Sequence, residues 1–158
     1  MFNSDRIRPL CDADVDFLAG RLREEDVREV ETASGDSAGV AILRGHSLSL
    51  GGAFVGLGHD GRPFCVFGVV PMEDGFGNVW MLATPEMERN KTVFLRTCQN
   101  VLSGWQTLFR LLGNAVDSRN TLHIKWLRWC GFTFLRAVPV GKDNVLFYEF
   151  VKLGGRDV

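Results

Sequence analysis

Histidine is the side chain whose protonation is best matched to neutral pH, and His123 is the candidate catalytic residue of this sequence. A predicted helix places His123 inside an apolar arc formed by Leu122, Trp126, Trp129 and Cys130. An imidazole in that setting could transfer a proton during catalysis. A half-buried histidine bonded to a backbone carbonyl would explain the same position, and the sequence leaves both interpretations open. The two tryptophans are expected in the core.

Carboxylates near the ends of predicted strands are the other groups that could accept a proton. Glu86 and Glu88 lie just beyond a strand predicted over 78–83, and Asp117 follows the next strand. Each could act as a general base or could be a surface or capping carboxylate. The single tyrosine, Tyr148, lies in a predicted strand near the end of the chain.

Cysteine and histidine, the usual metal ligands, are dispersed along the chain. No Cys-x-x-Cys pair is present, so no metal site is predicted. The cysteines are expected to be reduced and mostly buried thiols. The residues concerned are Cys11, Cys65, Cys98 and Cys130, with His46, His59 and His123.

Length and charge restrict the classes of protein that fit. The 158 residues suit one domain over 1–158, with a loose tail at 154–158. Eighteen basic and 19 acidic side chains give a net charge of −1, so specific binding to nucleic acid is not indicated. We expect no membrane association, because neither a signal peptide nor an apolar run long enough to span a bilayer is evident.

Hydrophobic periodicity predicts helices alternating with strands. Asp12 is expected to cap the first helix, and the Asp60-Gly61 pair predicts a β-hairpin. Gly131 is expected to end the last helix in a left-handed conformation. The predicted fold is α/β, with a mixed central sheet covered by helices on both faces. Strands are predicted over 7–11, 53–57, 63–70, 78–83, within 108–116, 132–140 and 145–151, and helices over 12–22, 23–31, 37–46, 92–105 and 120–130.

The segment from Asn120 to Phe132 resembles the penultimate-helix motif of the GCN5-related N-acetyltransferases, the GNAT family. In that motif an asparagine after a strand starts a helix that ends in Gly-Phe, with the spacing seen here for Asn120, Gly131 and Phe132. The asparagine is expected to cap the helix, the glycine to end it, and the aromatic ring to enter the core. The resemblance implies a single-domain GNAT-like fold.

A narrower resemblance links the chain to the internal virion protein A family of tailed bacteriophages. It extends from about Arg8 to Phe150 and implies association with a phage particle or its assembly. Other virion or assembly proteins would then be the partners, in the host cytoplasm during infection or the virion interior. The matching motifs are Arg8-Pro9, Asp60-Gly61-Arg62-Pro63, Thr84 to Arg89, Phe94-Leu95-Arg96, and Asn120-Thr121-x-His123-Ile124 with Leu127 and Gly131.

Acetyl-CoA is the cofactor that the GNAT resemblance implies. Active members bind its pyrophosphate with a glycine-rich loop between a strand and its helix, but the corresponding segment, 86–92, has no glycine. Arg89, Lys91 and Arg96 could supply charge instead, or could be solvated surface groups. The usual general acid, a tyrosine, is replaced by Leu127. The candidate cofactor-binding residues are Arg89, Asn90, Lys91, Thr92 and Asn120.

These observations favour a phage virion-associated or morphogenesis protein on an acetyltransferase fold whose catalytic equipment is degenerate. The alternative is an active acetyl-CoA-dependent N-acetyltransferase that modifies an amine on a host or phage protein. A plain protein-interaction module is a third interpretation. An open cleft between the strands that precede Thr84 and Asn120 is the feature that the chemistry requires, because CoA must enter there.

Overall fold

The computed structural model describes residues 5–154, and over this range seven strands form one mixed sheet in the order β1-β2-β3-β4-β5-β7-β6. Residues 155–158 of the predicted tail lie outside the described residues. The strands are β1 (Ile7–Pro9), β2 (Phe54–Leu57), β3 (Pro63–Pro71), β4 (Phe76–Ala83), β5 (Leu111–Asp117), β6 (Thr133–Val140) and β7 (Val145–Leu153). The helices are α1 (Asp12–Ala19), α2 (Glu24–Ser34), α3 (Ala38–Leu48), α4 (Lys91–Gln106) and α5 (Thr121–Trp129), with short 3-10 helices η1 (Glu73–Gly75) and η2 (Pro85–Asn90).

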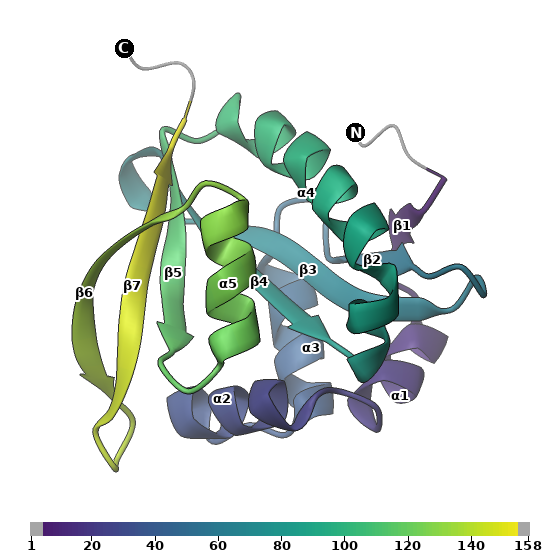
Figure 1. Ribbon diagram of the computed structural model, residues 1–158, viewed down its shortest axis with the longest axis horizontal. Coiled ribbons are helices and arrows are strands. Elements are labelled where there is room, and N and C mark those ends of the chain that lie inside the picture. The colour runs from purple at the N-terminus through teal and green to yellow at the C-terminus, as the bar shows by residue number, and fades with distance from the viewer. Residues whose placement is uncertain (1–4, 155–158) are drawn as a thin grey trace.

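Helices cover both faces of this sheet, as predicted. Figure 1 shows α4 and α5 in front of the sheet, α3 behind it and α2 along its lower end. One core cluster joins β5 to α4 and α5 through Leu112, Trp105 and Ile124. A second cluster joins α1 and α3 to the other face through Leu18 and Ile42. Strand β3 is therefore central, with apolar side chains on both faces.

The parallel pairing of β4 with β5 is the exception in the sheet, since every other adjacent pair of strands described is antiparallel. It comprises only three residue pairs, beginning with Phe76 and Leu111 and ending with Asn78 and Gly113. Strand β4 continues to Ala83 and β5 to Asp117, but beyond these three pairs the two strands do not pair with each other. The two strands therefore diverge, and the sheet opens between them (Figure 1).

Two glycines have the backbone conformation that the sequence predicts. Gly61 has φ +79° in the turn between β2 and β3, which pair antiparallel as a hairpin. Gly131 has φ +91° directly after α5, in the left-handed region that favours glycine. The predicted hairpin and the predicted end of the last helix are both confirmed.

Two local predictions were wrong. Asp12 is the first residue of α1, and Cys11 occupies the N-cap position while its backbone N–H donates to Asp14 at 2.9 Å. Trp126 is buried, but Trp129 is 61% exposed. The buried side of α5 includes His123, Ile124 and Trp126, so its centre is displaced from Trp129 around the helix axis.

Candidate functional site

A cleft opens where β4 and β5 separate, and its volume is about 490 Å³. Trp80 and Met81 of β4 line it, as do Ala115 and Val116 of β5. Each strand leads into a helix that also borders the cleft, so we call β4 with α4 the first arm and β5 with α5 the second arm. The open cleft between these two strands, which acyl-transfer chemistry requires in this fold, is therefore present.

Two asparagines lie where the β4–β5 pairing ends. Asn114 donates from Nδ2 to the backbone oxygen of Val79 at 2.7 Å, and so bridges the two strands one residue beyond their last pair. Asn78 Oδ1 is buried and has no hydrogen-bond partner within residues 5–154. Both asparagines line the cleft and contribute polar groups to its wall.

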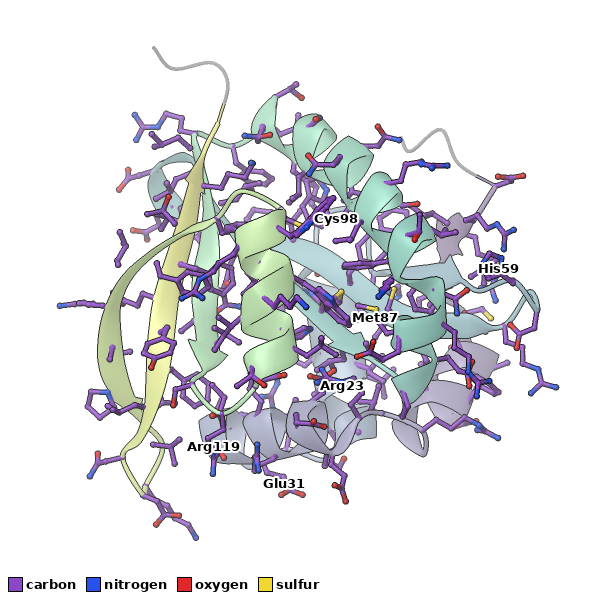
Figure 2. The ribbon with its side chains drawn as sticks, viewed as in Figure 1. Arg23, Glu31, His59, Met87, Cys98 and Arg119 are labelled. Carbon is purple, nitrogen blue, oxygen red and sulfur yellow. The ribbon has the colours of Figure 1, made fainter. Side chains whose placement is uncertain are left out.

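Asp26 of α2 is fully buried and connects the two arms. Its Oδ2 accepts from the backbone N–H of Ala83, at the end of β4, at 2.8 Å. Its Oδ1 accepts from Asn120 Nδ2 at 2.9 Å and from Arg23 at 3.1 Å. The Arg23 backbone N–H donates in turn to the Ala83 carbonyl at 2.8 Å. Figure 2 shows Arg23 between α2 and the lower end of α5.

Glu29 lies one helical turn further along α2 and lines the cleft. Its Oε1 accepts from the Asp117 backbone N–H at 3.0 Å and from Asn120 Nδ2 at 3.3 Å. Burial raises the pKa of Glu29 to about 7, with further increases from the charges of Asp26 and Asp117. A carboxyl group with a pKa near 7 exchanges protons readily at neutral pH, so Glu29 is a candidate general base.

His123 is buried beside this network, with 6% of its surface exposed. Its Nδ1 lies 3.3 Å from Asn120 Nδ2 and 3.7 Å from Asp26 Oδ1. Burial lowers the pKa of His123, although Asp26 opposes the shift. The half-buried histidine bonded to a carbonyl is therefore wrong. His123 lines the cleft, and its buried Nε2 has no hydrogen-bond partner in the described part of the chain.

Asn120 occupies the N-cap position of α5, but its side chain makes no capping hydrogen bond. Its Nδ2 donates to Asp26 and Glu29, and its Oδ1 accepts from Arg23 at 3.3 Å. The predicted capping role is wrong because two carboxylates of α2 and its N-cap residue Arg23 bind both ends of the amide. We call the polar network the set of four buried residues and the half-buried Glu29: Arg23, Asp26, Glu29, Asn120 and His123.

The other candidate cofactor residues lie around the start of α4. Arg89 is exposed and pairs with Glu86 at 3.5 Å, while Lys91 and Thr92 are exposed in the first turn of α4. Asn90 is buried: it donates to the Glu86 carbonyl at 2.9 Å and accepts from the His59 backbone N–H at 3.1 Å. The structure thus brings Arg89, Lys91 and Thr92 together on the surface, with Asn90 holding the β2–β3 turn and Asn120 in the polar network.

The segment from β4 into α4 is a packed helical turn. Met87 is fully buried and packs with Phe64, Ala83 and Trp126. Figure 2 shows it between α4 and α5. The 3-10 helix η2 runs into α4 at Lys91, which has right-handed helical angles. The turn thus differs from the glycine-rich loop of the resemblance: it has no glycine, and its interior is filled by side chains.

The acid and base positions expected from the sequence contribute little at the cleft. Leu127 lines it, whereas Tyr148 is 37% exposed on β7 and is not among the lining residues. Asp117 is buried and pairs with Arg119 at 2.7 Å; this partner holds the pKa of Asp117 low despite burial. Asp117 is thus an ion-paired carboxylate at the end of the second arm.

Sequence reasoning missed the α2 part of the network. Arg23, Asp26 and Glu29 recur at intervals of three residues, which places them along one side of a helix. That spacing was the available signal, but it is also typical of a solvated face. Within residues 5–154, no helix is long and apolar enough to cross a membrane, and no group of histidine, cysteine or acidic residues could hold a metal ion.

No protein-family model matches the chain, and no curated protein matches its sequence. Solved acetyltransferase structures match its fold. The chain is similar to a GNAT superfamily phosphinothricin acetyltransferase from Sinorhizobium meliloti in complex with acetyl-CoA, with 16% identity, 96% of this chain and 89% of that chain covered, and a TM-score of 0.72.

Two further structures extend this comparison. A spermidine N-acetyltransferase from Vibrio cholerae, in complex with CoA and spermine, has 11% identity, 95% of each chain covered and a TM-score of 0.69. A GCN5-related N-acetyltransferase from Kribbella flavida has 18% identity, covers 93% of this chain and 96% of its own, and has a TM-score of 0.63. The predicted GNAT fold is therefore confirmed.

Proposed function

We propose that this protein is a bacteriophage virion-associated or morphogenesis protein that uses an acetyltransferase fold as a scaffold and has a degenerate cofactor site. The observation that carries the degenerate cofactor site is the packed turn between β4 and α4, whereas the particle role rests on the resemblance to the internal virion protein A family. Met87 fills its interior, and Asn90 uses its side-chain amide to hold the neighbouring β2–β3 turn. A pyrophosphate would need open backbone N–H groups at this place.

The second arm supports the same proposal. The position expected to carry a tyrosine acid is Leu127, and the only tyrosine of the chain lies elsewhere on β7. Asn120 and His123 belong to the motif that resembles the internal virion protein A family, and both are buried in the polar network. A structural role would account for their presence in the motif, with no demand for catalysis.

Calorimetric titration with acetyl-CoA and with CoA tests the lost cofactor site. We expect no heat of binding up to millimolar concentrations. The particle role is tested separately. Phage particles are purified from infected cells that produce the protein, and quantitative mass spectrometry measures how much of the protein they contain. Micromolar binding together with acetyl transfer to an amine would contradict the proposal, as would absence from both particles and assembly intermediates.

An active N-acetyltransferase is the second candidate, and the open cleft with Glu29 on its wall favours it. An amine acceptor must lose a proton to become a nucleophile, and a carboxylate with a pKa of about 7 can take that proton at neutral pH. In this candidate function, acetyl-CoA supplies the acetyl group. The amine would then be one on a host or phage protein.

An acetyl-transfer assay with lysine-containing peptides and polyamines tests this candidate. It predicts a rate that rises with pH around an apparent pKa near 7, and a loss of at least about tenfold in kcat for Glu29→Gln with the fold retained. His123→Ala should also lower the rate without unfolding the protein. Absence of turnover at millimolar acetyl-CoA would exclude it.

A further inference from the structure

Two cysteines face each other across the upper part of the cleft. The Sγ atoms of Cys98 and Cys130 lie 3.0 Å apart, and both residues line the cleft. They are 32 residues apart in the sequence, so their meeting is a consequence of the tertiary fold. Both are free thiols.

This thiol pair connects the two arms. Cys98 lies within α4 of the first arm, and Cys130 is the C-cap residue of α5 in the second arm. Figure 2 shows Cys98 beside the end of α5. A covalent bond between them would tie α4 to α5 and limit how far the cleft can open.

The surroundings make the two thiols chemically unequal. The pKa of Cys130 is lowered, first by its hydrogen bond with the Cys98 thiol and then, against the opposing effect of burial, by the nearby Lys152 ammonium group. Lys152 Nζ donates to the Cys130 carbonyl at 2.9 Å. The pKa of Cys98 is raised by the same pairing and by burial. The hydrogen bond from Lys152 to the Cys130 carbonyl holds a positive charge beside Cys130, so we assign Cys130 as the nucleophile and Cys98 as the partner that resolves the product.

Cys65 shows what an unreactive thiol looks like in the same protein. It is buried, it makes no described hydrogen bond to another thiol although Cys98 lies near enough to feel its charge, and burial raises its pKa to about 12. Cys11 is exposed near the start of α1 and contacts Asp14 at 3.2 Å. Cys65 is therefore a control for the effect of burial on thiol oxidation, and Cys11 is a control for the effect of exposure.

We propose that Cys98 and Cys130 form a redox-active dithiol that hydrogen peroxide converts to a disulfide across the cleft. The Cys130 thiolate attacks one peroxide oxygen, the O–O bond breaks, and hydroxide leaves to give a sulfenic acid. The Cys98 sulfur then attacks the Cys130 sulfur and displaces hydroxide, which takes up the Cys98 proton. Two thiols and one peroxide yield one disulfide and two waters.

The test uses the purified full chain treated with hydrogen peroxide and then digested for mass spectrometry. We expect a linked peptide containing Cys98 and Cys130, with the number of free thiols falling from four to two. The disulfide should raise the Tm by roughly 5–15 °C, because it restricts the unfolded chain. Dithiothreitol should reverse both changes.

Three variants make the result specific. Cys98→Ser should abolish the linked peptide and leave a sulfenic acid on Cys130 that dimedone captures, whereas Cys130→Ser should abolish both products. Cys11→Ser is the matched control and should form the disulfide at an unchanged rate. If a variant is unstable, the wild type still tests the proposal. Its free thiols are titrated in the native state before and after peroxide treatment, and two of them must be lost.

Other outcomes would overturn the proposal. One is oxidation that begins at Cys11 or Cys65 while Cys98 and Cys130 stay reduced. Another is a disulfide between two chains, and a third is no loss of thiols at peroxide concentrations that oxidise free cysteine. None of these outcomes depends on whether acetyl-CoA binds, so the test is independent of the proposed function.

Discussion

The two arms of the cleft have the same plan, a strand that turns into a helix, but their turns are filled in opposite ways. The turn from β4 to α4 buries Met87 and leaves its charged residues Arg89 and Lys91 in solvent. The turn from β5 to α5 buries Asp117, Asn120 and, one helical turn later, His123. Of the two turns, only the one in the second arm therefore buries titratable side chains.

This difference indicates that the first arm depends mainly on the packing of apolar side chains, whereas the second arm depends on hydrogen bonds and ion pairs. Buried polar groups are costly unless each finds a partner, so the second arm depends on α2 to supply Asp26, Arg23 and Glu29. The first arm meets α2 chiefly through the backbone of Ala83. Mutations should thus affect the two arms by different mechanisms.

Removal of Asp26 should have the largest effect. Asp26→Ala leaves the buried Arg23 guanidinium with only the exposed Glu25 carboxylate, 3.6 Å away, and the Ala83 N–H without an acceptor. We expect a loss of about 3–5 kcal/mol in the free energy of unfolding, measured by urea denaturation. Glu31→Ala is the control, because Glu31 lies on the outer, solvated side of the same helix (Figure 2) and should change stability by less than about 0.5 kcal/mol. Equal losses in the two variants would contradict the assignment of the network.

Met87→Ala should have the next largest effect. The substitution opens a cavity among Phe64, Ala83 and Trp126, and we expect a loss of about 2–4 kcal/mol in the free energy of unfolding. Glu88→Ala, one residue along and exposed, is the matched control. If Met87→Ala instead left stability unchanged and created acetyl-CoA binding in calorimetry, the turn would be a gate to the cofactor site and not part of the core.

The pH dependence of stability isolates Glu29. Its folded pKa of about 7 lies above its ordinary value, so the folded state binds the proton more tightly than the unfolded state. The contribution of Glu29 is therefore fully present below its unfolded pKa and is lost as pH rises toward and past 7. We expect the wild type to lose about 1–3 kcal/mol more than Glu29→Gln between pH 5 and pH 8, measured by urea denaturation at each pH. Parallel pH curves for the two proteins would show that Glu29 titrates normally.

Backbone patterns were predictable from sequence because their causes are local. Asp60-Gly61 specifies the hairpin turn within a few residues, and Gly131 ends α5 by its own φ angle. The separation of β4 from β5 was not predictable from such patterns, since both strands read as ordinary apolar segments. Family resemblance alone suggested where an opening was needed.

The polar network escaped prediction because its partners are distant in the chain. Asn120 and Asp26 are 94 residues apart, and Arg23 and Asn120 are 97 apart. From sequence, the carboxylates of α2 look like a solvated helix face. The packing of α2 against the ends of β4 and β5 buries Asp26 and places Glu29 on the wall of the cleft. The same packing explains why Asn120 is a network residue and not a side-chain cap.

The smallest expected effect concerns the exposed charges of the first arm. Arg89→Ala and Lys91→Ala should each change the free energy of unfolding by less than about 0.5 kcal/mol, because both side chains are in solvent and Arg89 contacts only the exposed Glu86 among the described residues. Calorimetry with acetyl-CoA should give the same absence of heat for both variants as for the wild type. A wild type that binds acetyl-CoA, with affinity that falls at least about tenfold in Lys91→Ala, would show that charge replaces the missing glycines. In that case the first arm would be a working phosphate site. The two arms would then differ in how exposed their charged residues are, but both would contribute to function.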